Sequence, residues 1–510
     1  MAFTSASFAL FCIVGLIFYY IAPKKARWFV LLVLSYVFYL SGSVGSGAYI
    51  LFTTVTTYTA GRIIGNFQKG ETKEEKQQAK GARKIIAGIC LFLNFGLLYF
   101  VKYWNFTMDL LHFPGNILRF NILLPLGISF YIFQSMGYII DLVRAKYEPQ
   151  KNFFKFALFV SFFPQLTQGP IGRYDALSPQ LYRGNEFSFD NLKEGTKSVF
   201  WGLVKKMVIA DRAAVAACAI IDRYTEYNGS MILFGMVIYC IQLYCDFSGG
   251  IDVARGVAKM FGIDMAENFR RPLFATSLAD FWRRWHITLG SWLKDYLFYP
   301  ITLSKPFITL GKFTRKHIKG KAGKIIPTSV ATFIVYFVIG IWHGASWKYI
   351  LFGCWNGVII TASLLMQLQF TALKKRLRIN DGALYYKIIC IVRTSLIVVM
   401  GRFITRSSGV HDAIAMIKRV FFDFAPSALN SASLLNLGLS AADYAVITVG
   451  VLAIFVLELF DECGIRLTEK IENKNRVFTF ICMFICVLLF IIFGIFRGDY
   501  IASEFIYKQF

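Results

Sequence analysis

Histidine and charge are scarce in this sequence. Only 5 of its 510 residues are histidine, and charged residues make up 17% of the chain, whereas soluble domains carry roughly a quarter. Hydrophobic residues make up 56%, and the apolar runs leave no stretch long enough for a separate soluble domain. The composition therefore excludes a soluble multidomain protein and predicts an all-helical, polytopic membrane protein.

Metal-binding and disulfide patterns are missing too. The ten cysteines are scattered singly and none forms a C-x-x-C pair, so the sequence suggests neither a zinc site nor a disulfide framework. We expect no metal and no tightly bound cofactor. The first apolar segment, 7–23, lacks a basic start and a small-residue cleavage site, so we expect it to remain as a helix and not to be removed as a signal peptide.

Acidic residues are few compared with basic ones. The chain has 55 Lys+Arg against 30 Asp+Glu, a net charge of +25. Such an excess often indicates nucleic-acid binding, but here the positive charges form short runs between apolar segments, with no continuous basic stripe. This pattern is typical of the cytoplasmic loops of membrane proteins, where Lys and Arg also meet anionic headgroups. We expect contact with membrane lipids and none with nucleic acid.

About 12 segments are apolar enough to cross a bilayer, which takes about 20 apolar residues each. They lie near 6–23, 28–44, 47–64, 85–103, 121–142, 207–222, 230–247, 327–341, 347–367, 385–403, 441–460 and 477–496. A further stretch, 153–169, contains Pro164 and predicts a re-entrant or broken helix. The segment 281–301 is too charged to face lipid, so we expect it at the interface or inside the bundle.

The basic runs also predict the orientation of the chain in a plasma or inner membrane. If the most basic loops, such as 302–326 and 374–378, are cytoplasmic, both termini lie outside. His286 then lies in the inner half, and His343 lies toward the outer end of a helical hairpin. We expect one continuous polar passage to join the two histidines.

His343 is the first candidate for chemistry, because an imidazole is costly in a bilayer unless something nearby uses it. It lies in the motif WHGASW (342–347), where two small residues follow it and two tryptophans flank it. A neutral imidazole in such a dry pocket can accept a proton from an attacking hydroxyl. A histidine that binds a backbone carbonyl at a helix turn fits the motif equally well. Three neighbours are predicted to line the pocket: Trp342, Ser346 and Trp347.

His286 is the second candidate, in the segment FWRRWHITLGSWLKDYLFYP (281–300). If this segment is one helix, Trp282, Trp285 and His286 share a face. An amphipathic interfacial helix with an aromatic belt is the alternative. In the functional interpretation this segment closes the inner end of a channel. His286 then holds the reacting group and the tryptophans line the channel. Four cations would then bind the phosphates of a donor: Arg283, Arg284, Lys205 and Lys206.

Two further polar runs lie in apolar surroundings. The carboxylates of DFSGGID (246–252) need partners, and the arginines of the 281–300 segment are candidates. A structural role in ion pairs is favoured over catalysis for this cluster, which contains Asp246, Ser248 and Asp252. The run FPQLTQGPI (163–171) offers amides at the predicted helix break, and Gln165 and Gln168 are predicted to line a tunnel.

These motifs together resemble one family of membrane enzymes. The resemblance is carried by SFYIFQSMGYIIDLVR (129–144), FFPQLTQGPIGRY (162–174), GLVKKMVIADR (202–212), CDFSGGIDVARGVAKMFGIDMAENFRRP (245–272), the segment 281–300, GIWHGASW (340–347) and the closing EFIYKQF (504–510). They resemble the membrane-bound O-acyltransferases (MBOAT), and within them the bacterial alginate O-acetyltransferase-like branch. The D-alanyl transfer proteins of teichoic acid are cousins of this branch.

The resemblance implies a fold and the roles of two residues. The fold is a single membrane-embedded domain, residues 1–510, with a central tunnel. Its three regions are N-terminal helices (1–120), a catalytic core (121–370) and C-terminal helices (371–510). His343 matches the invariant histidine of the family, and His286 matches its second conserved polar position.

The resemblance also implies a reaction. A cytosolic thioester, in this branch acetyl-CoA, would give its acyl group to an extracytoplasmic hydroxyl, with an extracytoplasmic acetyltransferase as partner and a cell-surface polysaccharide as final acceptor. D-alanyl transfer from a carrier protein to teichoic acid is the alternative within the enzymes. A polysaccharide exporter or transporter is the alternative of another class, but it would more often show inverted repeats and paired intramembrane charges, and neither is visible.

Overall fold

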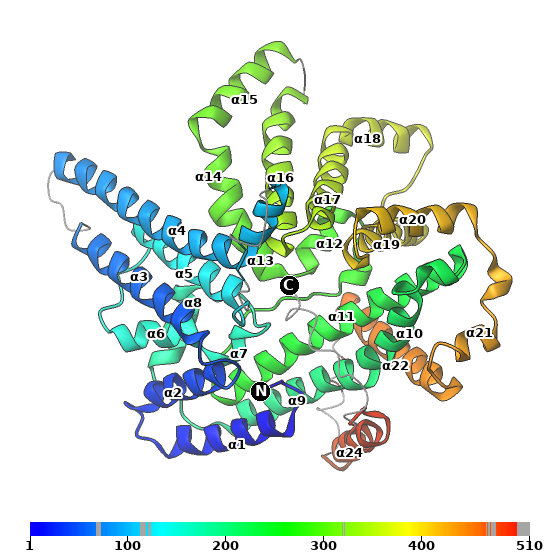
Figure 1. Cartoon of the computed structure of the whole chain (residues 1–510), viewed down its shortest axis with the longest axis horizontal. Helices are drawn as coiled ribbons and strands as arrows, with labels where there is room; N and C mark the ends of the chain where they lie inside the picture. Colours follow the sequence, from blue (N-terminus) through cyan, green and yellow to red (C-terminus); the bar gives the residue numbers. More distant parts are fainter. Residues whose placement is uncertain are drawn as a thin grey trace. The chain divides into compact units, whose positions relative to one another are not determined.

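The computed structural model describes residues 1–67, 73–112, 119–120, 124–318, 320, 322–465, 467, 470 and 476–496. Across these residues the regular secondary structure is helical, and the one β-type pairing is an isolated bridge between Phe269 and Trp285. The predicted all-helical fold is therefore confirmed (Figure 1). The closing motif at 504–510 and the start of the predicted span 121–142 lie outside the described residues.

The chain forms two compact units that alternate along the sequence. In the described residues, unit 1 comprises 1–201 and 250–267, and unit 2 comprises 202–249 and 268–496. The long helix α11 (Gly229–Met260) contributes its first part to unit 2 and its last part to unit 1. Both candidate histidines belong to unit 2. The division into N-terminal helices, core and C-terminal helices stays a prediction.

Unit 1 is a helical bundle with an aromatic core. Its core includes Phe38, Phe163 and Phe261, whose rings pack edge to face or tilted, with centroids 5.8 and 6.1 Å apart. Its helices are α1 (Ala6–Ile21), α2 (Arg27–Leu40), α3 (Gly47–Asn66), α4 (Lys73–Leu110), α5 (Ile128–Val143), α6 (Phe153–Ser161), α7 (Phe163–Leu166), α8 (Tyr174–Tyr182) and α9 (Phe189–Leu203), whose last two residues fall in unit 2.

The predicted break in the stretch 153–169 is confirmed. Helix α6 ends at Ser161, Phe162 is non-helical, and the short α7 starts at Phe163. The amide of Phe163 that the break frees donates to the hydroxyl of Ser35, at 3.2 Å. A buried backbone donor is therefore satisfied where the helix is interrupted.

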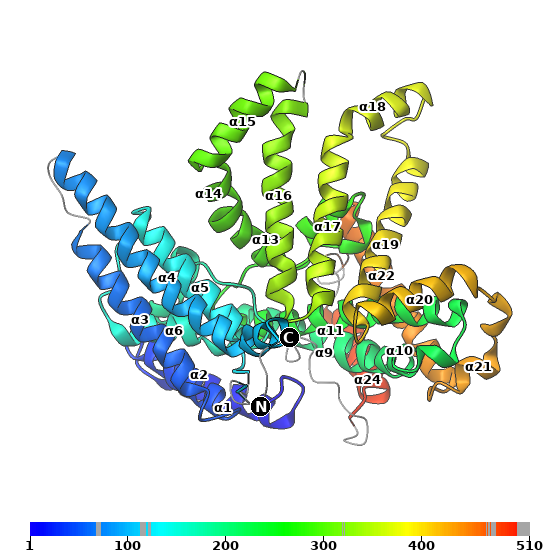
Figure 2. The same cartoon turned by 45° about the horizontal axis from the view of Figure 1, so that its top comes forward.

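Unit 2 contains a helical hairpin, α16 (Ala322–His343) and α17 (Trp347–Leu365), whose helices lie side by side (Figure 1, Figure 2). Before the hairpin come a π-helical turn (Val204–Ala210), α10 (Asp211–Ile221), the first part of α11, α12 (Leu278–Arg284), α13 (Ile287–Leu293), a second π-helical turn (Lys294–Phe298), α14 (Tyr299–Thr302) and α15 (Lys305–His317). After it come α18 (Gln367–Arg376), α19 (Leu384–Arg406), α20 (Val410–Phe422), α21 (Ser431–Leu435), α22 (Ala441–Glu462) and α24 (Arg476–Phe493).

Glycines bring the two helices of this hairpin into close contact. A Cβ atom added at Gly340 would lie 2.4 Å from the carbonyl oxygen of Tyr349, and one added at Gly353 would lie 2.6 Å from that of Tyr336. Real Cβ atoms do not approach backbone so closely, so only glycine allows this spacing. The close contact sets His343, at the end of α16, against the first turns of α17.

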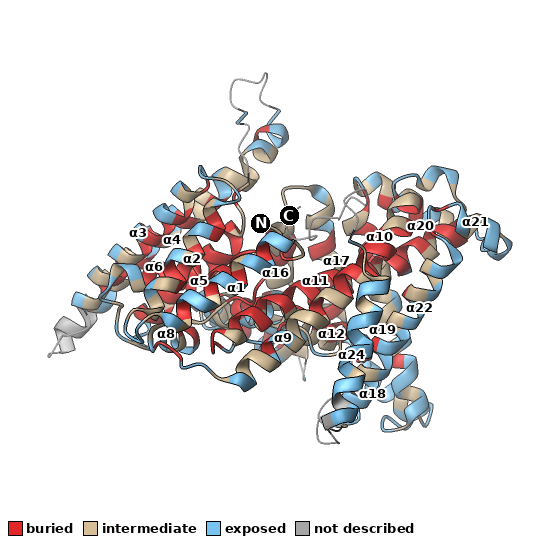
Figure 3. Cartoon of the chain, turned by 90° about the horizontal axis from the view of Figure 1, so that it is seen from below, coloured by how far each residue is buried: buried red, intermediate tan, exposed pale blue. Residues whose placement is uncertain are grey.

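Six helices among the described residues are long and apolar enough to cross a membrane. They are Ala79–Leu110, Gly229–Met260, Ala322–His343, Trp347–Leu365, Leu384–Arg406 and Ala441–Glu462. In α22 only 11% of the most apolar stretch is buried, so most of its apolar surface is exposed. Helix α11 is largely buried (Figure 3).

The predicted count of about 12 spans is not confirmed. Helices α1 and α2 are apolar but have 16 and 14 residues, fewer than the roughly 20 that an untilted span takes. The predicted span 207–222 is split between a π-helical turn and the short α10, where Ile220 and Ala216 are fully buried. The assignment of 207–222 as a span stays a prediction.

The prediction of one helix through Trp282, Trp285 and His286 is wrong. Helix α12 ends at Arg284, Trp285 is extended, and His286 has left-handed backbone angles of φ 49° and ψ 53° before α13 begins. A non-glycine residue in this region costs roughly 1–2 kcal/mol. Tertiary contacts around His286 must therefore hold the strained turn.

Candidate active site

Asn268 holds the turn at His286. Its carbonyl oxygen accepts a hydrogen bond from the amide of Ile287 at 3.1 Å, and its side-chain Oδ1 accepts from the amide and the hydroxyl of Thr288 at 3.0 and 2.6 Å. Asn268 is fully buried. One asparagine thus satisfies the donors at the start of α13, as a helix cap does, and fixes the backbone from which the imidazole projects.

His286 is enclosed by aromatic rings. Its side chain is 3% exposed, and its ring centroid lies 5.1 Å from that of Phe247 and 6.0 Å from that of Trp342. Burial lowers the pKa of His286 to about 3. The imidazole is therefore neutral at physiological pH, with one nitrogen that donates a hydrogen bond and one that accepts.

His343 lies at the C-terminal end of α16, beside the same tryptophan. Its ring centroid is 5.0 Å from that of Trp342 and 5.7 Å from that of Phe352 in α17. It is half-buried, whereas His286 is buried. Trp342 therefore contacts both imidazoles, and the structure brings the two predicted histidines to one aromatic cluster of unit 2.

Two of the other predicted tryptophans extend this cluster. The indole nitrogen of Trp282 donates to Oδ1 of Asn356 at 3.0 Å, and its ring lies 6.1 Å from Phe352. Trp285 is 8% exposed and packs edge to face on Phe269, with ring centroids 4.9 Å apart. Direct contacts therefore hold both rings in place, as we expect for residues that line a tunnel.

Ser346 and Trp347 have different surroundings. Ser346 precedes the first residue of α17 and has extended backbone angles. Trp347 is 55% exposed. Their predicted place along a tunnel stays a prediction, and in this structure Trp347 contributes most of its surface to the outside.

The lysine pair occupies a buried ion cluster. Lys206 is 2% exposed, and its Nζ lies 2.5 Å from Asp246 and 2.9 Å from Asp211. Burial alone would lower the pKa of Lys206, but the two carboxylates raise it above its ordinary value. Lys205 is also buried and donates to the hydroxyl of Ser248 at 3.1 Å. Asp246 is thus paired with a lysine and not with the arginines that we expected.

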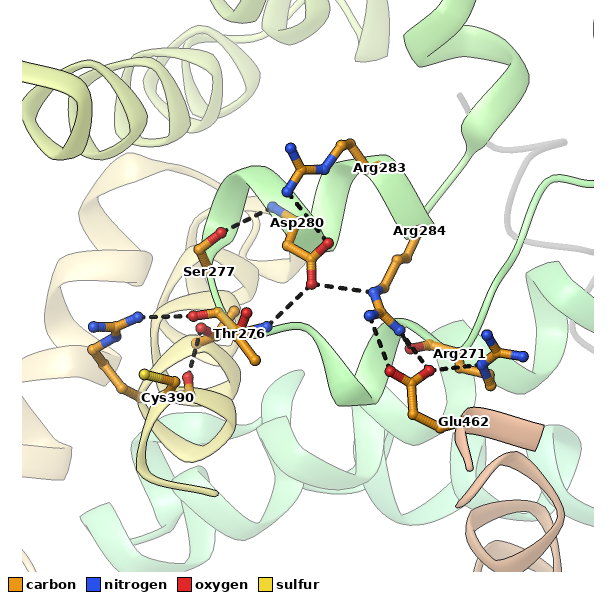
Figure 4. Close-up of polar contacts among 10 residues, drawn as sticks. Arg271, Thr276, Ser277, Asp280, Arg283, Arg284, Cys390 and Glu462 are labelled. Carbon is orange, nitrogen blue, oxygen red and sulfur yellow. Dashed lines mark hydrogen bonds and ion pairs between the residues drawn. The ribbon is translucent and has the colours of Figure 1, made fainter. Parts of the chain in front are cut away.

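The arginine pair divides into a bound and an exposed residue (Figure 4). Arg284 lies between Asp280 and Glu462, with distances of 3.1 Å to the first and 2.9 and 3.1 Å to the two oxygens of the second. These partners, Glu462 foremost, raise the pKa of Arg284. Arg283 is 73% exposed and has one long contact, 3.4 Å, to Asp280. Of the four predicted donor-binding cations, Arg283 is the one whose charge faces outward.

The remaining predicted residues lie in unit 1. Gln165 and Gln168 are 3% and 1% exposed, at the broken helix. The amide of Gln165 donates to the carbonyl of Phe159 at 3.1 Å, and among the described residues the Gln168 side chain has no hydrogen-bond partner. The backbone carbonyl of Asp252 accepts a hydrogen bond from Ser198 at 2.8 Å.

Sequence reasoning missed four residues of the site: Phe247, Asn268, Phe352 and Arg402. The first two lie in motifs that carried the family resemblance, but neither residue type indicated a role by itself. Arg402 did offer a signal, because a cation within an apolar span is rare and costly. The buried arginine lies in α19, over the rings of Trp285 and Phe352.

Comparison with known proteins identifies the family of the chain. Residues 142–400 match the sequence model of MBOAT, the membrane-bound O-acyltransferase family. A probable alginate O-acetylase from Pseudomonas syringae pv. tomato is 33% identical over 90% of this chain and 82% of that protein. A peptidoglycan O-acetyltransferase from Helicobacter pylori is 31% identical over 59% of each chain. A teichoic acid D-alanyltransferase from Bacillus subtilis is 27% identical over 52% of this chain and 64% of that protein.

These likenesses confirm the family predicted from the motifs. They extend over both histidines and over nearly the whole chain, and the structure adds helices apolar enough to cross a membrane. The chain belongs to the MBOAT family and is a membrane-bound O-acyltransferase.

Proposed function

We propose that the protein transfers an acetyl group from acetyl-CoA on the cytosolic side to a hydroxyl on the outer side of a plasma or inner membrane. The acceptor belongs to a cell-surface polysaccharide, reached through an extracytoplasmic acetyltransferase partner. The observation that supports this proposal is the shared contact of His286 and His343 with Trp342. Two imidazoles beside one indole are close enough for one to act on the acceptor hydroxyl and the other on the thioester.

His343 is the general base in this proposal. Its ring nitrogen takes the proton of the acceptor hydroxyl while the hydroxyl oxygen bonds to the thioester carbonyl carbon. The carbon–sulfur bond then breaks, the thiolate leaves, and the proton on His343 passes to the sulfur. The products are an ester and a free thiol. His343 is half-buried, whereas His286 is buried.

His286 orients the thioester in this proposal. Since burial lowers its pKa to about 3, it acts as a neutral hydrogen-bonding group and not as a charge. The surrounding rings of Phe247 and Trp342 keep water away, which limits hydrolysis of the donor.

The donor's phosphates bind the exposed Arg283 in this proposal. Lys206 and Arg284 are supported as structural ion pairs instead, because carboxylates already neutralise them. A bound cation with two carboxylate partners attracts a phosphate weakly, whereas the 73% exposed Arg283 is accessible.

Acetyl transfer is favoured over D-alanyl transfer by the extent of the likeness. The alginate relative covers 90% of the chain at 33% identity, and the teichoic acid relative covers 52% at 27%. A donor assay separates the two: acetyl-CoA is consumed in the first case, and a D-alanyl carrier protein is consumed in the second.

The proposal is tested with the full-length protein in vesicles supplied with labelled acetyl-CoA. The wild type should consume the thioester and label an outer hydroxyl acceptor, and His343→Ala should lower the rate by roughly 10²–10⁴-fold. His317→Ala is the matched control, because His317 is exposed and its hydrogen bond within the described residues goes to the carbonyl of Phe313 in its own helix, at 2.9 Å. Full activity of a folded His343→Ala protein would refute the assignment.

A further inference from the structure

Arg402 carries a buried charge that the proposed mechanism does not use. It lies near the end of α19 and is 7% exposed. Its Cζ lies 5.3 Å from the ring centroid of Trp285 and 5.6 Å from that of Phe352. Among the described residues, its guanidinium has no ion-pair or hydrogen-bond partner, and the one bond at this residue is donated by Thr405 to its backbone carbonyl, at 3.3 Å.

Arg212, in contrast to Arg402, is buried with hydrogen-bond partners. Arg212 is the other buried arginine in the described part of unit 2, at 8% exposed. Its Nε donates to Asp443 at 3.0 Å, and its Nη1 donates to the carbonyl oxygens of Val208 and Phe493. Burying a charge without a partner is expensive, and a guanidinium has five N–H donors to satisfy. Cation–π contacts replace only part of the lost hydration.

The two rings attract the charge of Arg402 but offer its N–H groups no oxygen acceptor. A guanidinium carries its five N–H donors along the edge of a planar fork. That edge is the part that binds two oxygens of a carboxylate or a phosphate in parallel. One turn further along α19, Arg406 is already paired with Asp222 at 2.8 Å.

The location connects this charge to the candidate active site. Phe352 contacts both Arg402 and His343, and the ring centroids of Phe352 and His343 lie 5.7 Å apart. Trp285, the other ring beneath the guanidinium, is the residue before His286. An anion bound to Arg402 would therefore lie beside the residues proposed to handle the acyl group.

We propose that Arg402 forms an anion-binding subsite of the active site, which takes a carboxylate or phosphate group of a substrate through its guanidinium edge. The proposal rests on the proposed acyl transfer. The same chemistry has two sources, a phosphate of the acyl donor or a carboxylate of the acceptor sugar. In either case Arg402 is a binding residue that selects a charged substrate over a neutral one.

Binding to the full-length protein in detergent tests the subsite without depending on turnover. Two charged probes are each matched with a neutral one: acetyl-CoA with S-acetylpantetheine, and a hexuronate with its parent hexose. The variants are Arg402→Gln and Arg402→Met, of which the second keeps an apolar chain against the rings if the first fails to fold. Arg393→Gln is the control, because it removes an exposed charge from the same helix.

We expect the Arg402 variants to weaken one charged probe by about 10- to 100-fold, as loss of a charge-assisted hydrogen bond does, and to leave its neutral partner unchanged. A loss for acetyl-CoA identifies the donor phosphate, and a loss for the hexuronate identifies the acceptor carboxylate. Unchanged binding of both charged probes, an equal loss for charged and neutral probes, or no binding of any probe to the wild type would overturn the subsite. Failure of the His343 assay alone would instead overturn the proposed function.

Discussion

The indole of Trp342 packs against the imidazole of His286, with ring centroids 6.0 Å apart and ring planes at 65°. Trp342 is also the neighbour of His343 in sequence and in space. The two histidines come from different parts of the chain, 57 positions apart in a turn and at a helix end. A single aromatic side chain therefore joins a neutral, buried imidazole to a more accessible one.

Trp342→Ala should destabilise the protein by about 3–5 kcal/mol, because it removes a buried indole and leaves a cavity. Trp342→Phe keeps an aromatic ring between the histidines and should retain most of the stability and transfer activity. Thermal unfolding and labelled acetyl transfer measure the two effects. Equal behaviour of the alanine and phenylalanine variants would show that the ring has no positioning role.

His286→Asn is a sharper test than alanine, since asparagine tolerates the left-handed backbone of this turn. We expect lower acetyl transfer with the fold preserved. Asn268→Ala serves as the companion variant: it removes the side-chain acceptor that holds the turn and should lower both stability and transfer. Normal transfer by His286→Asn contradicts a role for the imidazole.

The same histidine predicts a pH effect on stability. Its folded-state pKa of about 3 lies below the ordinary value of 6.5, so the unfolded chain binds a proton that the folded protein does not. Stability is therefore lost as the pH falls below 6.5, by about 2 kcal/mol between pH 7.5 and pH 5. Chemical unfolding of the wild type and His286→Asn at both pH values measures the difference, which should be smaller in the variant. Parallel curves for the two proteins would count against a buried neutral imidazole.

Arg283→Gln should weaken the apparent affinity for acetyl-CoA and leave the maximal rate nearly unchanged, because the exposed guanidinium binds the donor and not the reacting carbonyl. The effect should shrink at high salt, which screens exposed charges. Arg223→Gln is the control, another exposed arginine with a single acidic neighbour, Glu226 at 3.6 Å. If Arg283→Gln and the control have the same donor affinity at low salt, Arg283 does not bind the donor.

Lys206→Met should destabilise the protein by about 3–5 kcal/mol, because it leaves buried carboxylates without their cation. Replacing Asp211 and Asp246 by asparagine in the same chain should restore part of the loss. Unfolding in detergent compares the single and the combined variants. No recovery in the combined variant would mean that the cluster acts through packing and not through charge.

Sequence alone determined the class of the protein, because composition and helical apolar runs are local properties of the chain. The scarcity of charge, the isolated histidines and the motifs around them identified the family and singled out both histidines as candidates. The break at 153–169 was also readable, since Pro164 cannot continue a helix with full hydrogen bonding. Residue type and local backbone preference can be read directly from the sequence.

Tertiary structure decided which partners surround these residues. Helical periodicity predicted a continuous helix through His286, but contacts from Asn268, distant in sequence, hold a left-handed turn there. Charge type alone could not tell that Lys206 and Arg284 bind carboxylates while Arg283 faces outward. Ion-pair partners and burial depend on which distant segments meet, and so the neutralised and the available charges were distinguishable only in the folded chain.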